Sequence, residues 1–205
     1  LGEVYKRQDQ FPEVPVLALT ATATPEVIND IQDKLHFRKK NVFQKSFERK
    51  NLYYVIRQTN DKLSEIFHIL ERVAGSAIIY VRSRQRTKEI AVELQRTGIS
   101  ADYFHAGLTS DEKEKKQNAW KEGECRVIVS TNAFGMGIDK PDVRLVIHFE
   151  LPSSLEEYFQ EAGRAGRDEK KAYAVALYST QDGSLLKRRI RDTFPEKEFI
   201  KDVYE

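Results

Sequence analysis

The sequence is poor in the residues that support disulfide, zinc or membrane structure. It has one cysteine, Cys125, in 205 residues, which excludes an internal disulfide framework and a cysteine-rich zinc site. Cys125 precedes an apolar run, so we expect a buried structural thiol rather than a reactive one. No apolar run approaches the roughly 20 residues of a membrane span, and no signal peptide opens the chain. We therefore expect a cytoplasmic protein without membrane contact, associated with the nucleoid if it is bacterial.

Two further shortages narrow the function. The net charge is only +2, so any nucleic-acid surface must come from local basic patches. The phosphate-binding pattern Gly-x-x-x-x-Gly-Lys-Ser/Thr is absent, so the chain lacks the loop that cradles nucleotide phosphates in many ATPases. With 40% hydrophobic and 32% charged residues, the composition is still that of a soluble globular protein.

Apolar runs and helical patterns alternate along most of the chain. The runs predict strands at 14–20, 52–56, 76–81, 100–104, 126–130, 144–149 and 172–178. Helices are predicted from Pro25 to near Phe37 and at 61–73, 84–96, 109–120 and 154–162. This alternation predicts an α/β fold with a parallel sheet covered on both faces. Ligands of such sheets bind at the carboxyl ends of the strands.

The stretch 160–168 (QEAGRAGRD) carries the strongest chemical signal. Arg164 and Arg167 are each set off by glycine, and a guanidinium group matches phosphate oxygens bidentately. The glycines let the chain turn away from the preceding helix and allow a close backbone approach. This is how an arginine finger for a nucleotide γ-phosphate is built. The alternative is a helix end with a glycine turn and two solvated arginines.

A second stretch, 127–144 (VIVSTNAFGMGIDKPDVR), makes the chain recognisable. Together the two stretches resemble motifs V and VI of superfamily 2 helicases, and their residues look like those of the RecQ family of DNA helicases. Residues 17–23 (LALTATA) resemble motif III, while 77–84 (AIIYVRSR) and 104–108 (FHAGL) resemble motif IV and the element just after it. The resemblance covers about residues 14–192, in the order of the family.

The resemblance implies a division of the chain. Residues 1–45 correspond to the end of the first RecA-like lobe, 46–180 to the second, helicase C-terminal lobe, and 181–205 to the helical start of the following RecQ region. In the family, the phosphate loop and the Asp-Glu-x-His box for magnesium lie upstream of motif III, and neither is in this sequence. ATP and Mg²⁺ would therefore be held mainly by the first lobe, and we expect the isolated chain to be inactive.

The resemblance also implies a nucleotide site. Arg167 is our choice for the finger, Arg164 supports the same phosphate or links it to the DNA surface, and Gln160 lies one helical turn earlier. Asp139 matches a motif V position that contacts the ATP ribose, next to Gly137, where the backbone can bend tightly. Asp139 is alternatively a turn residue that bonds its own backbone.

For DNA, the resemblance and the strand ends point to one set of side chains. Hydroxyl, amide and basic groups that follow strands can hold phosphates, and the candidates are Arg82, Ser83, Arg84, His105, Ser130, Thr131, Asn132, Lys140 and Arg144. Three alternatives stay open: simple helix capping by Ser83, solvated charges at Lys140 and Arg144, and a hydrogen-bonded loop histidine at His105. No His, Cys or Asp partner has a spacing that would make His105 a metal ligand, so we expect no metal site. Thr20 and Thr22 resemble the motif III hydroxyls that couple hydrolysis to lobe movement.

These features predict part of an ATP-dependent 3′–5′ DNA helicase of repair or recombination. Its expected partners are single-stranded and partly duplex DNA and the first lobe of the same protein. A DEAD-box-like RNA helicase lobe is one alternative, although Gln160 stands where that family usually has His. A non-catalytic nucleic-acid-binding module is the other alternative.

Overall fold

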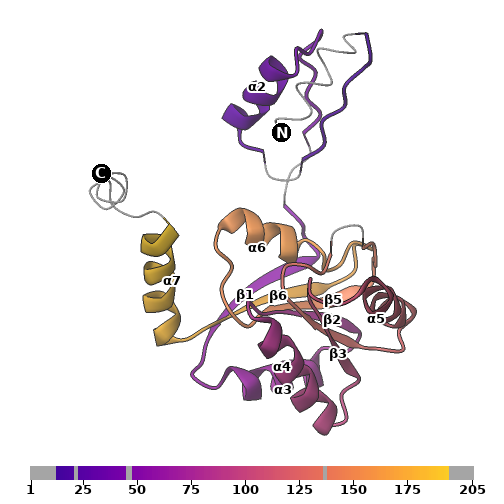
Figure 1. The fold of residues 1–205 in the computed structure, drawn as a ribbon, viewed down its shortest axis with the longest axis vertical. Coiled ribbons are helices and arrows are strands. Elements are labelled where there is room, and N and C mark those ends of the chain that lie inside the picture. The colour runs from indigo at the N-terminus through magenta and orange to yellow at the C-terminus, as the bar shows by residue number, and fades with distance from the viewer. Residues whose placement is uncertain (1–12, 21–22, 45–47, 136–137, 194–205) are drawn as a thin grey trace. The chain divides into compact units, whose positions relative to one another are not determined.

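The computed structural model describes residues 13–20, 23–44, 48–135 and 138–193 (Figure 1). The chain divides into two compact units, Leu1–Glu48 and Arg49–Glu205. The sequence placed the corresponding boundary near residue 45.

In the first unit, the expected helix forms but the expected strand does not. Helix α2 (Pro25–Lys34) begins as predicted, with Pro25 in its first turn and the Thr24 hydroxyl accepting a hydrogen bond from the Val27 amide at 3.4 Å. The strand predicted at 14–20 is wrong, because this segment runs without strand pairing. A strand needs a hydrogen-bonded neighbour, and no other strand lies among the described residues of this unit.

The second unit is built on a six-stranded parallel sheet with the order β1-β6-β5-β2-β4-β3. The strands are β1 (Leu52–Gln58), β2 (Ser76–Tyr80), β3 (Ala101–Phe104), β4 (Val127–Ser130), β5 (Val143–His148) and β6 (Ala172–Tyr178). Every residue of the central strand β2 is buried, and Ile78 pairs with Ile128 on one side and Val146 on the other. The parallel sheet predicted from the sequence is therefore confirmed.

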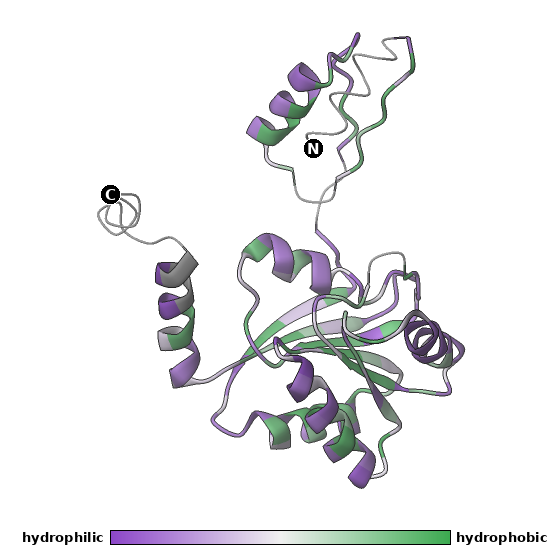
Figure 2. Ribbon diagram, viewed as in Figure 1, coloured by the Kyte–Doolittle hydropathy of each residue, from purple (hydrophilic) through white to green (hydrophobic). Residues whose placement is uncertain are grey.

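Helices cover both faces of this sheet, as the alternation predicted. They are α3 (Lys62–Arg72), α4 (Arg84–Arg96), α5 (Ser110–Glu122) and α6 (Leu155–Ala162), followed by α7 (Thr180–Thr193). Residues of α3 and α4 share one apolar cluster with alternate strand positions such as Ile79, and Trp120 of α5 and Ala162 of α6 share the other with Ile78. Figure 2 shows the apolar strands enclosed between amphipathic helices.

Short polar signals decide where these helices begin and end. Thr109 and Glu112 form the capping box that the sequence predicted for α5, and Asp61, Ser83 and Ser154 accept hydrogen bonds from the first turns of α3, α4 and α6. Cys125 is buried, as expected, and its burial raises the pKa of its thiol to about 11. Because all six strands are parallel, the loops that follow β2, β4 and β5 emerge at one edge of the sheet.

Candidate functional site

The arginine-rich loop 163–168 follows α6 and is anchored from two other parts of the unit. The Gly166 amide donates to the Val143 carbonyl at 2.8 Å. From the chain just before β1, Arg49 Nη1 donates to the Gly163 carbonyl at 3.0 Å, and Asn51 Nδ2 donates to the Gly166 carbonyl at 2.7 Å. The loop is therefore fixed to the sheet, as a loop that presents a catalytic side chain has to be.

Arg164 reaches back from this loop to the other glycine-rich stretch. Its Nη1 donates to the Gly135 carbonyl at 2.6 Å. Gly135 has φ +132°, and a Cβ there would lie 2.0 Å from Cζ of Arg164, so the position needs glycine both for its backbone and for the close approach. This hydrogen bond joins the two stretches that resemble motifs V and VI. From the sequence, only their nearness along the chain was known.

Tyr80, at the end of β2, supports the same junction. Burial raises the pKa of the Tyr80 phenol above its ordinary value, although nearby Arg164 opposes the shift. The phenol therefore stays protonated and donates to the Phe134 carbonyl at 3.1 Å. Phe134 packs edge-on against Phe104 and Trp120, which ties the loop after β4 into the core.

Arg167 lies nearer to solvent than Arg164. Its Nη1 donates to Asp139 Oδ1 at 2.9 Å and to the Ile138 carbonyl at 3.3 Å. The side chains of Arg167 and Asp139 are 38% and 80% exposed, and an ion pair so exposed contributes about 0–1 kcal/mol. A phosphate could therefore replace Asp139 at little cost. Asp139 thus pairs with an arginine, an interaction that neither of the two roles predicted from the sequence included. Its contact with the ATP ribose stays a prediction.

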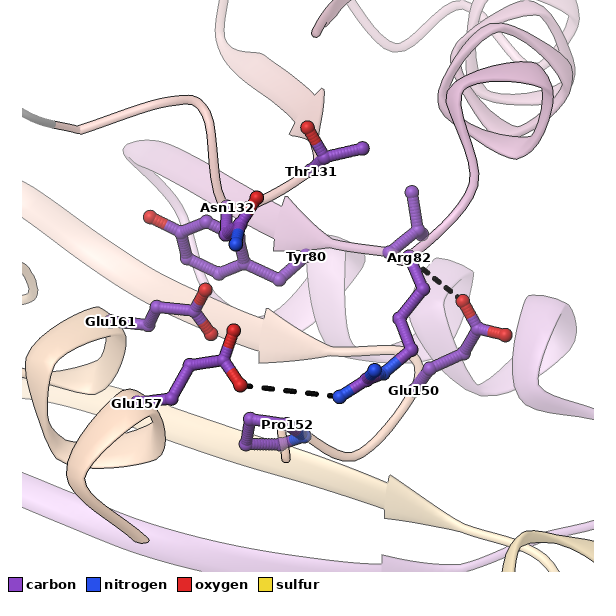
Figure 3. A pocket seen from close by; sticks show the side chains of 9 residues that line it. Tyr80, Arg82, Thr131, Asn132, Glu150, Pro152, Glu157 and Glu161 are labelled. Atoms are coloured by element: carbon purple, nitrogen blue, oxygen red, sulfur yellow. Dashed lines mark hydrogen bonds and ion pairs between the residues drawn. The ribbon is translucent and has the colours of Figure 1, made fainter. Parts of the chain in front are cut away.

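A cavity of about 110 Å³ lies at the carboxyl ends of β2, β4 and β5 (Figure 3). Thr131 and Asn132 line it together with three carboxylates, which belong to Glu150, Glu157 and Glu161. In Figure 3 the Arg82 side chain lies between Glu150 and Glu157. The Arg82 amide donates to Glu150 at 2.7 Å, and its guanidinium lies 3.9 Å from Glu157. Three carboxylates around one arginine make this cavity unfavourable for a phosphate.

Behind this cavity, a buried pair joins α6 to the sheet. His148 Nε2 lies 2.9 Å from Glu161 Oε2, and both residues are buried. The ring of His148 stacks on Tyr80 with centroids 5.6 Å apart. Sequence reasoning missed both residues, because a histidine inside an apolar strand and a glutamate on a helix carry no sign of their pairing.

A wider groove of about 660 Å³ runs between α4 and the loop after β3. Arg84, His105 and Gly107 line it, and no hydrogen bond or ion pair to another described residue holds the Arg84 guanidinium. The His105 ring stacks on Tyr103, and its buried Nδ1 has no hydrogen-bond partner among the described residues. Arg84 is therefore available to a ligand, whereas the Ser83 hydroxyl accepts from the Arg86 amide at 3.0 Å as a helix cap. Contact of His105 with DNA stays a prediction, because its Nδ1 is buried.

The other predicted DNA contacts are engaged inside the protein. The buried Ser130 hydroxyl lies 2.9 Å from the Phe104 carbonyl, to which it donates, and Thr131 is only 9% exposed. Lys140 donates to the Lys121 carbonyl at 2.9 Å, and Arg144 pairs with Asp168 at 2.5 Å and lowers the pKa of that carboxyl. Lys140 and Arg144 are thus structural cations rather than solvated ones, and contact with DNA by these four residues stays a prediction.

The remaining candidates lie at the surface or outside the described residues. Gln160 and Asn132 are exposed, and so is Thr20 in the first unit. Gly137 and Thr22 lie outside the described residues. In the part of the chain that the structure describes, no helix is long and apolar enough to cross a membrane, and no group of three potential metal ligands occurs.

Comparison with known proteins places this site in a family. Residues 58–169 match the model of the helicase conserved C-terminal domain. The chain is 42% identical over 183 residues to "ATP-dependent helicase SGS1" of Saccharomyces cerevisiae and 42% identical over 184 residues to "RecQ-like DNA helicase blm-1" of Caenorhabditis elegans. These matches cover 87% and 88% of this chain but 12% and 19% of the relatives, so the chain spans less than a fifth of either protein.

The fold agrees with these matches. The structure of Saccharomyces cerevisiae Dbp5 bound to RNA and ADP BeF3 aligns with 95% of this chain and 53% of its own, with a TM-score of 0.72 and 21% identity. The chain belongs to the helicase C-terminal domain family, and the relatives that it resembles include a RecQ-like DNA helicase. The DEAD-box alternative is not favoured, because the two curated relatives are 42% identical to this chain, whereas the DEAD-box proteins SrmB of E. coli and Dbp5 of Saccharomyces cerevisiae are 29% and 21% identical.

Proposed function

We propose that this chain provides the second RecA-like lobe of a RecQ-type helicase, which couples ATP hydrolysis to 3′–5′ movement on single-stranded DNA. The observation that carries the proposal is the anchored arginine loop, which holds Arg164 against Gly135 and leaves Arg167 exposed beside a weak partner. A cation fixed before the reaction stabilises the charge that develops on transferring phosphoryl oxygens.

The residues present fit one end of a nucleotide rather than a whole one. Arg167 can turn from the exposed Asp139 to a γ-phosphate, and Arg164 keeps the loop in place while it does so. The sequence has neither a phosphate loop nor an Asp-Glu-x-His box. We therefore assign the binding of Mg²⁺ and most of ATP to the first lobe of the full-length protein, and charge stabilisation to Arg167.

For DNA, we propose the groove beside α4 as the phosphate-binding surface. Arg84 and Lys88 supply basic groups on its rim, His105 lies beside them, and the groove is also lined by Glu89, Glu93 and Glu112. Asn132 adds an exposed amide at the neighbouring strand end. The substrates would be single-stranded and partly duplex DNA during repair or recombination, in the cytoplasm or on a bacterial nucleoid.

The isolated chain and the full-length protein should differ in ATP hydrolysis. We expect DNA-stimulated turnover by the full-length protein and none by the 205-residue chain, because nothing in the chain positions the β- and γ-phosphates. Both are measured as phosphate release at saturating single-stranded DNA. Turnover by the purified chain that survives mutation of Arg167 would contradict the proposal.

A further inference from the structure

Arg49 is the first residue of the second unit and lies three residues before the edge strand β1. It is more than 110 residues away in sequence from the arginine loop, yet its guanidinium group contacts that loop twice. Nη1 donates to the Gly163 carbonyl at 3.0 Å, and Nη2 donates to the Gly166 carbonyl. The two carbonyls bracket Arg164, so one rigid fork spans the backbone that carries it.

Asn51 completes the same contact. Its Nδ2 donates to the Gly166 carbonyl at 2.7 Å and to the Lys170 carbonyl at 2.9 Å. Gly166 has φ +62°, and a Cβ there would lie 2.7 Å from Asn51 Nδ2, so the loop approaches as closely as only glycine allows. Arg49 and Asn51 together satisfy carbonyls that a glycine-rich turn would otherwise leave to water.

We propose that Arg49, assisted by Asn51, is a positioning residue for Arg164 and Arg167; the proposal rests on the function proposed above. The two carbonyls that accept hydrogen bonds from Arg49 directly precede Arg164 and Arg167 in the chain. Arg49 therefore acts on the backbone that carries the two arginines and not on their guanidinium groups. A displacement of about 1 Å at a catalytic group can lower a rate about 10²-fold.

The first test uses the 205-residue chain and hydrogen exchange. In Arg49→Met, the Gly166 amide, which is bonded to the Val143 carbonyl, should exchange faster while amides of the central strands β2 and β4 keep their protection. Arg57→Met is the matched control, because Arg57 lies in β1 and pairs with Glu65 away from the loop. Unchanged exchange at Gly166 in Arg49→Met would overturn the proposal.

The second test uses ATP hydrolysis by the full-length protein. Arg49→Met should lower kcat about 10- to 100-fold with a smaller effect on the KM for ATP, and Arg57→Met should leave both unchanged. If Arg49→Met does not fold, Arg49→Lys is the alternative variant. Its kcat should fall less than that of Arg49→Met, because the lysine ammonium group can still donate to one of the two carbonyls but cannot span both. A normal kcat in the folded variant would contradict the positioning role.

A double mutant separates this proposal from the one on which it rests. If Arg49 acts through the arginine loop, Arg49→Met should cause a much smaller further loss of hydrolysis once Arg167→Ala is present than it causes in the wild-type protein. A full additional loss would show that Arg49 acts independently of Arg167, and so overturn the inference alone. Normal hydrolysis in the Arg167→Ala single mutant would instead overturn the proposed function, and the inference with it.

Discussion

Similar apolar sequences are exposed in the first unit and buried in the second. In the first unit, Leu17 and Leu19 are 80% and 85% exposed in a segment without strand pairing. In the second, Ile78 and Ile79 of β2 are 1% and 0% exposed between two hydrogen-bonded neighbours. Both runs are short, apolar and bounded by turn or cap residues. The difference lies in the strands beside them, because a strand becomes stable only when its backbone groups are paired.

The same contrast separates the two kinds of functional residue. The arginine loop lies in the unit that contains the six-stranded sheet, and two parts of that unit anchor it: the segment before β1, through Arg49 and Asn51, and the start of β5, through Val143. Thr20, the motif III candidate, lies exposed at the end of segment 14–20, which forms no strand. The arginine loop is therefore held in place within its own unit, whereas the motif III candidate has no strand beside it among the described residues of the first unit.

The largest expected effect concerns core stability. Trp120 is 1% exposed and its Nε1 donates to the Ala77 carbonyl at 3.2 Å, so Trp120→Ala should destabilise the chain by about 3–5 kcal/mol. Leu17→Ala should change the stability by less than about 0.5 kcal/mol, because an exposed side chain loses little on truncation. Urea unfolding followed by circular dichroism measures both, and equal losses would break the contrast between the units.

A smaller effect is expected in DNA binding by the chain. One cationic phosphate contact, at Arg84, should weaken binding to single-stranded DNA about 2- to 3-fold between about 50 and 200 mM salt, at a logarithmic slope of about −0.7 per contact. Arg84→Ala should lower that slope, and the matched variant Arg57→Ala should not. Fluorescence anisotropy of a labelled oligonucleotide measures this. Tight binding that ignores salt would place the DNA surface elsewhere.

The smallest effect is expected on deleting residues 1–45. The fold of the second unit should remain, with a change in Tm of less than about 3 °C, since 1 kcal/mol corresponds to roughly 2–4 °C at this size. Self-association should fall, because an unpaired apolar segment seeks another edge. Thermal melting and light scattering of both forms measure these quantities. A large fall in Tm would show that the segment belongs to the core of the second unit.

Local signals in the sequence predicted most of the fold. The Thr109–Glu112 capping box and the Thr24-Pro25 pair fixed the starts of two helices, and apolar runs such as 76–81 fixed the strands. A strand was predicted at 14–20 from the same kind of apolar run, and this prediction was wrong. An apolar run indicates that a segment tends to be buried, but it does not show that a second strand is present to pair with it. A strand prediction therefore holds only where the rest of the sheet is in the same unit.

The site was less predictable than the fold. Arg164 and Arg167 were found from their glycine spacing, but Arg49, which anchors them, contacts a loop 114 residues away and looks like any surface arginine in the sequence. Lys140 and Arg144 look like exposed cations in the sequence, yet their partners, the Lys121 carbonyl and Asp168, hold them inside. Such pairs are set by the tertiary fold, and one sequence by itself does not reveal them.

The most direct test of the central claim is ATP hydrolysis by the full-length Arg167→Ala variant at saturating DNA. The account predicts a loss of about 10³-fold or more, the usual scale for a finger arginine, with DNA binding near normal. Arg164→Ala should also impair hydrolysis, because it releases the hydrogen bond to the Gly135 carbonyl. Retention of more than roughly a tenth of the wild-type rate by Arg167→Ala, on the same scale, would contradict the account and assign the finger to another residue.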